Sequence, residues 1–161
     1  MSHSKSLHRA QSQNIARKIL RGKTIAVLGF GSQGQAQALN MRDCGLGVIV
    51  GLRRASRGWQ KARKAGFEVF ETGEAARRAD IIHVLVPDEV HGEVYEKDIR
   101  PNLSAGKTLS FSHGFSITFG LIEPPKNVDV VLVSPKAPGK ALREKFVAGS
   151  GVPGVFAVRQ D

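Results

Sequence analysis

The stretch T-I-A-V-L-G-F-G-S-Q-G, from Thr24 to Gly34, decides the fold of this chain. Its first five residues are apolar and partly β-branched, which predicts a buried strand, and a helix-like stretch begins at Ser32. Between them lies the spacing G-x-G-x-x-G. In this spacing the first glycine makes a tight turn, the second lets the backbone approach a pyrophosphate, and the third lets the helix pack closely.

A glycine loop in this strand-to-helix context favours a dinucleotide site over a turn that has no ligand. The helix N-terminus attracts phosphate through its free N–H groups and its dipole. The residues that we predict to hold the pyrophosphate are Gly29, Phe30, Gly31, Ser32, Gln33 and Gly34.

Length and composition indicate a globular protein of 161 residues, which suits one domain with a core of its own. The single cysteine, Cys44, excludes an internal disulfide and favours a reducing compartment, and we expect it to be a small packed residue. No apolar run approaches the ~20 residues of a membrane span. No signal-peptide pattern stands near the start. We therefore expect a cytoplasmic location and no membrane partner.

The N-terminal residues 1–13 are polar and basic, and we expect them to form a mobile extension ahead of a domain that spans 14–161. A start with Arg and Ser but no acids also resembles a transit peptide, which leaves a plastid or mitochondrial location open. Residues 14–20 predict a brief helix. Its apolar side chains, which we expect to face the core, are Ile15, Ile19 and Leu20.

The net charge of +10 indicates an anionic partner, and the charge is unevenly distributed. No acid occurs before Asp43, and the stretch from Arg53 to Lys64 is basic without an acid. Nucleic acid is one candidate, but the interleaved aromatic residues that single-strand binders use are sparse. A phosphorylated cofactor explains the cluster more simply.

Apolar runs alternate with turn residues and helical patterns along the rest of the chain. We expect strands over 24–28, 47–52, 67–70, 81–86, 108–111, 128–133 and 152–158. We expect helices over 32–42, 56–65 and 73–78, and another from residue 87. This alternation predicts an α/β fold, a doubly wound and mostly parallel sheet of the Rossmann type with helices on both faces. His83, inside the fourth strand, is expected to be a hydrogen-bonded core or edge residue rather than a ligand-binding one.

The loop after the second strand distinguishes NAD from NADP in this type of fold, because an acid there binds the ribose 2′-hydroxyl and an arginine accommodates a 2′-phosphate. Here Leu52 is followed by R-R-A-S-R, with no acid. Guanidinium groups suit a phosphate in charge and in geometry. We therefore predict NADP(H) as the cofactor. The predicted 2′-phosphate loop consists of Arg53, Arg54, Ser56 and Arg57, of which at least one arginine is expected to be merely solvated.

Ligands of such folds bind outside the carboxyl ends of the strands. The nicotinamide contacts that we predict there are Val86, Pro87, Asp88, Glu89, His113 and Gly114. His113 and Lys136 follow the fifth and sixth strands, so both should project near one crevice. They suit proton transfer or the holding of an anion, although position alone leaves a structural role equally open.

Five stretches together resemble ketol-acid reductoisomerase (acetohydroxy-acid isomeroreductase). They are K-T-I-A-V-L-G-F-G-S-Q-G-Q-A-Q-A-L-N, V-G-L-R-R-A-S-R-G-W, V-P-D-E-V, S-H-G-F-S-I-T-F-G and S-P-K-A-P-G-K. The likeness runs from about Ile15 to Asp161. It implies a reaction of valine and isoleucine biosynthesis, in which a Mg²⁺-assisted alkyl migration in a 2-acetohydroxy acid precedes reduction by NADPH. It also implies that His113 and Lys136 are the catalytic residues.

The chain departs from the family's usual pattern at three positions. Gly58 stands where a second serine is common, Ser112 where an alanine precedes the histidine, and Lys140 where a histidine is usual. The resemblance further implies that two Mg²⁺ ions are held by carboxylates of a helical C-terminal domain. No such set of acids is apparent here, so we predict no metal ligand in this chain.

The resemblance leads to the hypothesis of an NADPH-binding domain that is not catalytically complete alone. On this hypothesis Mg²⁺ and the 2-acetohydroxy acid bind only together with the helical domain or a partner subunit. Two alternatives remain open, namely a stand-alone NADP(H)-binding module that acts as a sensor or partner subunit, and a basic domain associated with nucleic acid. An apolar surface left uncovered would favour self-association.

Overall fold

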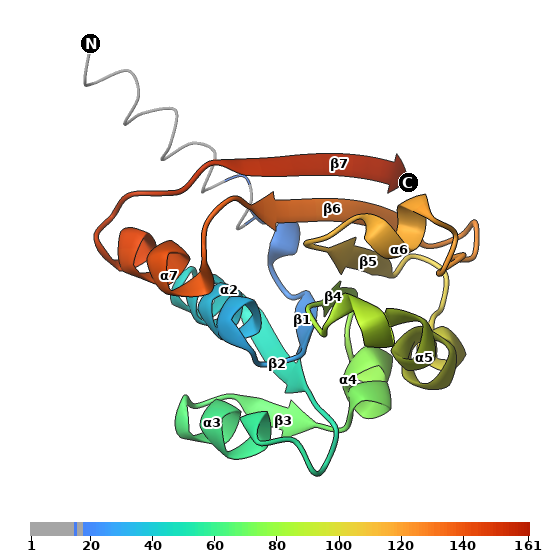
Figure 1. The fold of residues 1–161 in the computed structure, drawn as a ribbon, viewed down its shortest axis with the longest axis horizontal. Helices are drawn as coiled ribbons and strands as arrows, with labels where there is room; N and C mark the ends of the chain where they lie inside the picture. Colours follow the sequence, from blue (N-terminus) through green and yellow to red (C-terminus); the bar gives the residue numbers. More distant parts are fainter. Residues whose placement is uncertain (1–14, 16–17) are drawn as a thin grey trace.

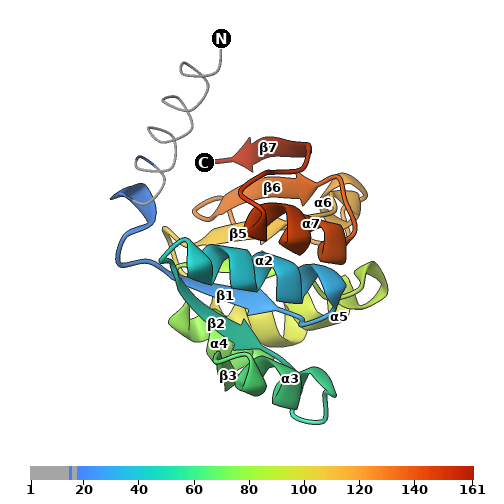
Figure 2. The ribbon, with the colours of Figure 1, turned by 90° about the vertical axis from the view of Figure 1, so that its left-hand side faces the viewer.

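The computed structural model describes Ile15 and residues 18–161. The predicted extension over 1–13 and three of the seven residues of the first predicted helix (14, 16 and 17) lie outside these residues. Ile15 and Ile19, which were expected in the core, are 60% and 68% exposed. That expectation was wrong, because the segment that ends at Leu20 lies beyond the start of the first strand and covers neither face of the sheet (Figure 2).

Seven strands form one sheet in the order β3-β2-β1-β4-β5-β6-β7, which runs from bottom to top in Figure 1. The strands are β1 (Thr24–Leu28), β2 (Gly47–Gly51), β3 (Glu68–Phe70), β4 (Ile81–Val84), β5 (Thr108–Phe111), β6 (Asp129–Pro135) and β7 (Gly154–Gln160). All seven lie within a few residues of the predicted ranges. The pairings from β3 to β6 are parallel, which confirms the predicted mostly parallel, doubly wound sheet.

The last strand, β7, runs antiparallel to β6. The connection explains this direction. After the helix that follows β6, the chain turns back, and Pro153 lies beside Lys136, whose amide N–H donates to the Pro153 carbonyl at 2.8 Å. β7 therefore begins beside the last residue of β6, where Gly154 pairs with Pro135, and it must run in the direction opposite to β6.

Helices cover both faces of the sheet, as Figures 1 and 2 show. On one side lie α2 (Ser32–Asp43), α3 (Gly58–Lys64) and α7 (Gly139–Val147), and on the other lie α4 (Thr72–Arg78), α5 (His91–Val94) and α6 (Phe115–Thr118). The helices α6 and α7 were not predicted. None of the helices in the described part of the chain has the length and hydropathy needed to cross a membrane.

The helix expected from residue 87 is a succession of shorter turns. A 3₁₀ turn (Asp88–Val90) leads into α5, then into a π-helical turn (Tyr95–Ile99) and a second 3₁₀ turn (Arg100–Asn102). Pro101 lies in the last of these, and its missing N–H prevents the α-helical pattern from continuing.

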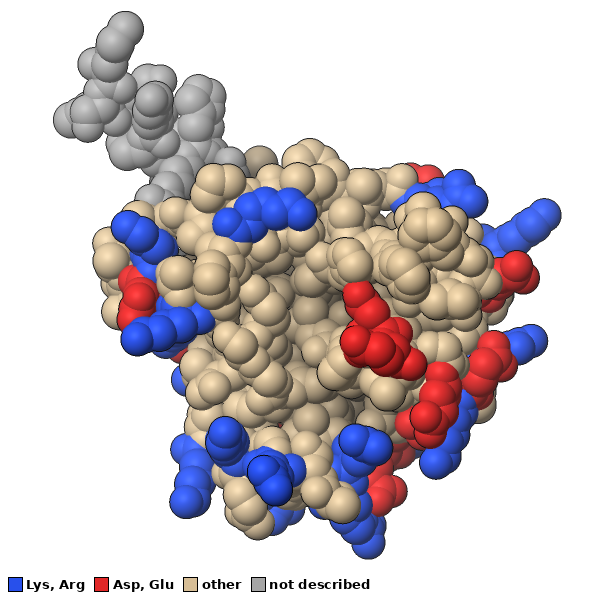
Figure 3. Space-filling view, viewed as in Figure 1, with Lys and Arg blue, Asp and Glu red and all other residues tan. Residues whose placement is uncertain are grey.

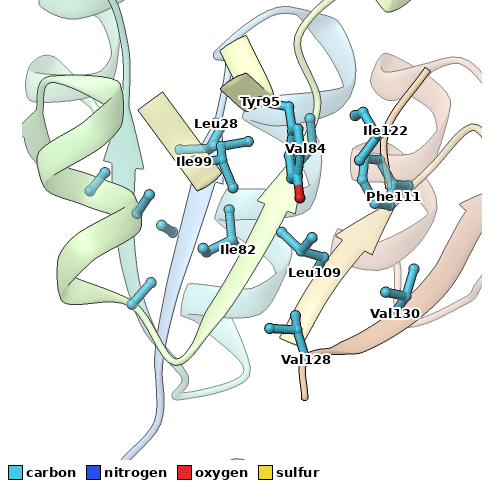
Figure 4. Close-up of a cluster of buried hydrophobic side chains, with 14 of the residues drawn as sticks. Leu28, Ile82, Val84, Tyr95, Ile99, Leu109, Phe111, Ile122, Val128 and Val130 are labelled. Atoms are coloured by element: carbon cyan, nitrogen blue, oxygen red, sulfur yellow. The ribbon is translucent and has the colours of Figure 1, made fainter. Parts of the chain in front are cut away.

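The sheet is buried on both faces by two apolar clusters. The larger one, drawn in Figure 4, joins β1, β4 and β5 to α4 and to the turns after α5, with Leu28, Ile82 and Phe111 among its members. Val27 and Val50 point the other way, into the cluster beneath α2 and α3. Burial on both faces explains why these strands are continuous apolar runs rather than alternating ones.

Candidate cofactor-binding site

The glycine loop after β1 has the backbone that its sequence predicts. Gly29 has a φ of +101°, and a Cβ there would lie 2.7 Å from the Leu85 carbonyl oxygen. A Cβ on Gly34 would lie 2.2 Å from the Gly29 carbonyl oxygen, so α2 can pack this closely only with glycine. Gly31 has open space beside it and is the N-cap of α2, with no side chain bonded to the helix amides. The loop therefore leaves room and N–H donors for a pyrophosphate.

Phe30 takes a different role from the one that its place in the loop suggested. Its side chain is 7% exposed and packs edge-to-face on Phe67, with 5.7 Å between ring centroids. Only the backbone of Phe30 is therefore available to a ligand.

The start of α7 abuts the glycine loop, a contact that the sequence did not indicate. A Cβ on Gly139 would lie 2.2 Å from the carbonyl oxygen of Ser32. Nearby, the Gln33 side-chain amide donates to the Ala137 carbonyl at 2.8 Å. The only sequence feature at this contact is the pair Pro138-Gly139. Because this pair is typical of a turn as well as of a helix start, it does not predict α7 or its contact with the glycine loop.

The predicted 2′-phosphate loop lies at the end of β2, where Lys and Arg side chains gather along the lower edge of the face in Figure 3. Arg54 is tied to Glu71, with Nε 2.8 Å from Oε1. Arg53 and Arg57 form no ion pair with any residue that the structure describes. Ser56 accepts the amide N–H of Gly58 at 3.1 Å, although α3 begins at Gly58 and not at Ser56.

A cleft of about 230 Å³ opens where β4, β5 and β6 end. It is lined by Gln33, Val84, Leu85, Val86, Asp88, His91, Ser112, His113 and Pro135. Four predicted residues from three separate segments thus meet at one cleft. Pro87, Glu89 and Gly114 are adjacent in sequence to residues that line the cleft, but they do not line it themselves.

Lys136 follows Pro135 but does not line the cleft. Its Nζ donates to the Ser134 hydroxyl at 3.3 Å.

Asp88 lies between two histidines at the mouth of this cleft. One carboxylate oxygen forms a short hydrogen bond with Nδ1 of His113, and the other lies 3.5 Å from Nε2 of His91. The His113 ring also stacks on Phe115 at an interplanar angle of 9°. Since both contacts restrain the ring, His113 is held in one orientation.

His91, which sequence reasoning did not single out, is 2% exposed. Its Nε2 donates to the Val86 carbonyl, and its Nδ1 accepts from the Ser116 hydroxyl, each at 2.9 Å. It joins α6 to the loop that carries Asp88. In the sequence, His91 is a single histidine flanked by acidic residues, and this local pattern does not indicate that its ring links α6 to the loop of Asp88.

Beneath the cleft, β4 places His83 among buried side chains, at 5% exposure. Both ring nitrogens are hydrogen-bonded, to Ser110 and Gln37, which confirms the prediction of a core histidine. Burial lowers the pKa of His83 to about 4. The ring is therefore neutral at physiological pH.

The residues present fit a dinucleotide but not Mg²⁺. The space beside Gly31 and the unpaired Arg53 and Arg57 suit the phosphates of NADPH. Mg²⁺ prefers about six oxygen ligands in octahedral geometry. Among residues 15 and 18–161, no group of three or more His, Cys, Asp or Glu side chains could hold a metal ion.

The parallel sheet, the glycine loop and the basic loop together define a Rossmann-type dinucleotide-binding domain. Residues 19–161 match the family described as acetohydroxy acid isomeroreductase, NADPH-binding domain, and the chain belongs to that family. The resemblance noted in the sequence is thereby confirmed.

Two curated relatives are ketol-acid reductoisomerases (NADP(+)). The one from Pyrobaculum aerophilum is 58% identical over 142 residues, and the one from Petrotoga mobilis is 59% identical over 143 residues. The matches cover 88% and 89% of this chain but 43% of each relative. The chain thus spans less than half the length of the curated relatives that it matches.

A solved structure of an NADH-preferring ketol-acid reductoisomerase from an uncultured archaeon superposes with a TM-score of 0.86 at 49% identity. The match covers 88% of this chain and 44% of that chain. The fold and the NADP(H)-binding class of this chain are therefore established by its family.

Proposed function

We propose that this chain supplies the cofactor-binding half of a ketol-acid reductoisomerase, an enzyme that rearranges and reduces 2-acetohydroxy acids with NADPH. The observation that carries the proposal is the pairing of His113 with Asp88 at the mouth of the cleft. A dinucleotide-binding scaffold alone would not need a restrained histidine where the strand ends meet. The names of the relatives support the same assignment.

In this proposal the cofactor lies along the carboxyl ends of the strands. The backbone of the glycine loop and the N-terminus of α2 bind the pyrophosphate, and Arg53, Ser56 and Arg57 bind the 2′-phosphate. The segment from Val86 to Glu89, together with His113 and Gly114, borders the nicotinamide. When it is bound, NADPH supplies a hydride.

The residues of the chain would then position the substrate and handle its protons. With Nδ1 bonded to Asp88, the Nε2 atom of His113 has no partner among the described residues and can exchange a proton with a substrate oxygen. Lys136, one residue beyond the cleft lining, is suited to hold a substrate carboxylate by charge. The described residues do not fit Mg²⁺, so we assign to this chain only the reduction and the proton transfer.

Calorimetric titration of the chain with NADPH and with NADH tests the first part of the proposal. We expect NADPH to bind at least about 10-fold more tightly, because two arginine–phosphate contacts are lost with NADH. Equal binding of both nucleotides, or no binding, would contradict it.

A chimera tests the second part. Residues 19–161 would replace the matching stretch of the Petrotoga mobilis relative, and turnover of 2-acetolactate with NADPH and Mg²⁺ would be measured. We expect an active chimera in which His113→Gln lowers kcat by at least about 100-fold while NADPH still binds. An active H113Q chimera would show that this histidine is not the proton-transferring residue.

A further inference from the structure

A continuous chain of hydrogen-bonded side chains lies beneath the cleft and joins β4, β5 and α2. The Nδ1 and Nε2 atoms of His83 lie 2.9 Å from the Ser110 hydroxyl and from Oε1 of Gln37, respectively. Nε2 of Gln37 in turn lies 3.2 Å from both Oε1 of Gln33 and the Ser112 hydroxyl. Gln33 and Ser112 line the cleft, so the chain connects a buried ring to the site itself.

Two backbone carbonyls fix the donors and acceptors of this hydrogen-bond network from Ser112 and Gln33 as far as Nε2 of His83, because a carbonyl can only accept. The Ser112 hydroxyl donates to the Val133 carbonyl at 2.8 Å, so it must accept from Gln37. The Gln33 amide donates to the Ala137 carbonyl at 2.8 Å, so its oxygen must face Gln37. Both contacts require the NH₂ group of Gln37 on that side.

The opposite end of the Gln37 amide is then its oxygen, which faces His83. Nε2 of His83 must therefore carry a proton. Because burial lowers the pKa of His83 to about 4, the ring is neutral and in the Nε2–H tautomer, and its Nδ1 accepts from the Ser110 hydroxyl. The buried ring acts as a fixed donor for Gln37.

This order of donors and acceptors determines which atoms of the Gln33 side-chain amide remain available to the cleft. Its oxygen is occupied by Gln37, and one N–H is occupied by Ala137. The second N–H of the amide has no partner among the described residues. A donor suits a phosphate or ribose oxygen, whereas the reversed amide would place a carbonyl oxygen against an anion.

We propose that His83 and Gln37 are positioning residues that hold the Gln33 amide with an N–H toward the nicotinamide half of the cofactor. This inference rests on the proposed function, since it assumes NADPH in the cleft. Neither residue touches the cofactor. They act through Gln33 and through Ser112, the neighbour of His113. The replacement of the family's usual alanine by Ser112 thus has a structural reason, because its hydroxyl completes the network.

The test compares two ligands across three variants. NADPH reaches the cleft, whereas 2′,5′-ADP carries only the adenine half and depends mainly on the Arg53 loop. Gln37→Met removes both donors to Gln33 and Ser112, and His83→Leu removes the donor to Gln37. We expect each to raise the Kd for NADPH about 10-fold and the Kd for 2′,5′-ADP by less than about 2-fold. His83→Gln keeps an N–H for Gln37, and we expect it to restore NADPH affinity to within about 3-fold.

A matched control separates positioning from loss of stability. Val128 is buried in the larger cluster at the opposite end of β6, so Val128→Ala should destabilise the fold without changing either Kd. Long-range ¹H–¹⁵N NMR of the histidine rings supplies a second readout, and we expect the Nε2–H tautomer at His83.

The outcomes are distinct. An Nδ1–H tautomer at His83 would overturn the polarity of the network, whatever the chain binds. Normal NADPH binding by Q37M, or equal losses for both ligands, would overturn the positioning role while the proposed function stands. Failure of the wild-type chain to bind NADPH would overturn both.

Discussion

The backbone of Ser32 lies so close to Gly139 that a Cβ at position 139 would be 2.2 Å from the Ser32 carbonyl oxygen. This contact fastens the start of α7 to the glycine loop. We predict that Gly139→Ala displaces the loop, lowers the free energy of unfolding by about 1–3 kcal/mol and raises the Kd for NADPH at least about 10-fold. Denaturant unfolding and calorimetry measure the two effects.

Gly151 provides the control for this prediction, because a Cβ there would have no atom of a non-adjacent described residue within 4 Å. Gly151→Ala should change stability by less than about 0.5 kcal/mol and should leave NADPH affinity unchanged. If G139A binds NADPH as the wild type does, the contact with Ser32 does not shape the phosphate site.

The three arginines after β2 should contribute unequally to cofactor choice. Arg54 is engaged by Glu71, whereas Arg53 and Arg57 have no ion pair among the residues described. We predict that the double variant R53A/R57A loses about 10- to 100-fold in affinity for NADPH and little for NADH, since only the 2′-phosphate contacts are removed. Titration of both nucleotides at one salt concentration measures the preference.

Arg63 is the matched control, since it is an exposed cation in the last turn of α3, whereas Arg57 is the N-cap residue of the same helix. R63A should leave the ratio of the two Kd values within about 2-fold. Equal losses in R63A and in R53A/R57A would indicate general electrostatic attraction rather than recognition of the 2′-phosphate.

The parts of the fold that could be predicted are those encoded locally. The strand, turn and helix from Thr24 to Asp43 each have their own signal, namely apolar β-branched residues, glycine spacing and a helical pattern. The seven strands were predicted because each is a short apolar run between turn residues. The candidate site followed from a topological rule, since parallel strands bring their carboxyl ends to one edge.

The parts that could not be predicted depend on contacts between distant residues. The direction of β7 is set by how the segment after α7 returns to Lys136. α7 itself starts with Pro138-Gly139, and its Gly139 is needed because of Ser32, more than 100 residues earlier. Likewise, the roles of Gln37 and His91 come from partners on other elements, so neither residue could be recognised in its own sequence window.

The pKa of His83 predicts how stability depends on pH. In the unfolded chain this imidazole titrates near 6.5, whereas burial lowers its pKa in the folded chain to about 4. Between these values the unfolded state binds a proton that the folded state does not, so stability falls as pH decreases from 6.5 to 4. The loss approaches about 3 kcal/mol at pH 4 and is absent above pH 7.

Denaturant unfolding of the wild type and of His83→Gln over this pH range measures the contribution of His83 as a difference. Other titrating groups cancel in the difference because they are common to both proteins. We expect the wild type to lose stability relative to H83Q as the pH falls. A difference that does not change with pH would mean that the imidazole is protonated in the folded state or that its pKa is unshifted.

The outer strand of the sheet predicts self-association of the chain. Phe156 and Val158 on β7 are 84% and 62% exposed, and Phe156 pairs with Val133, which is itself 47% exposed. β7 ends the sheet, so within the described part of the chain no strand lies beside its outer N–H and C=O groups. An exposed apolar edge strand is a template for pairing with another chain. We therefore predict concentration-dependent association, seen by light scattering after size-exclusion chromatography.

Phe156→Lys should reduce this association, because a charged side chain on an edge strand must be desolvated when a second strand pairs with it. Phe119→Lys is the comparison, since Phe119 is 67% exposed but is the C-cap residue of α6 and not part of β7. We expect F119K to associate as the wild type does and F156K to remain monomeric at concentrations where the wild type does not. If the two variants behave alike, the apolar surface that associates is not the one that β7 presents.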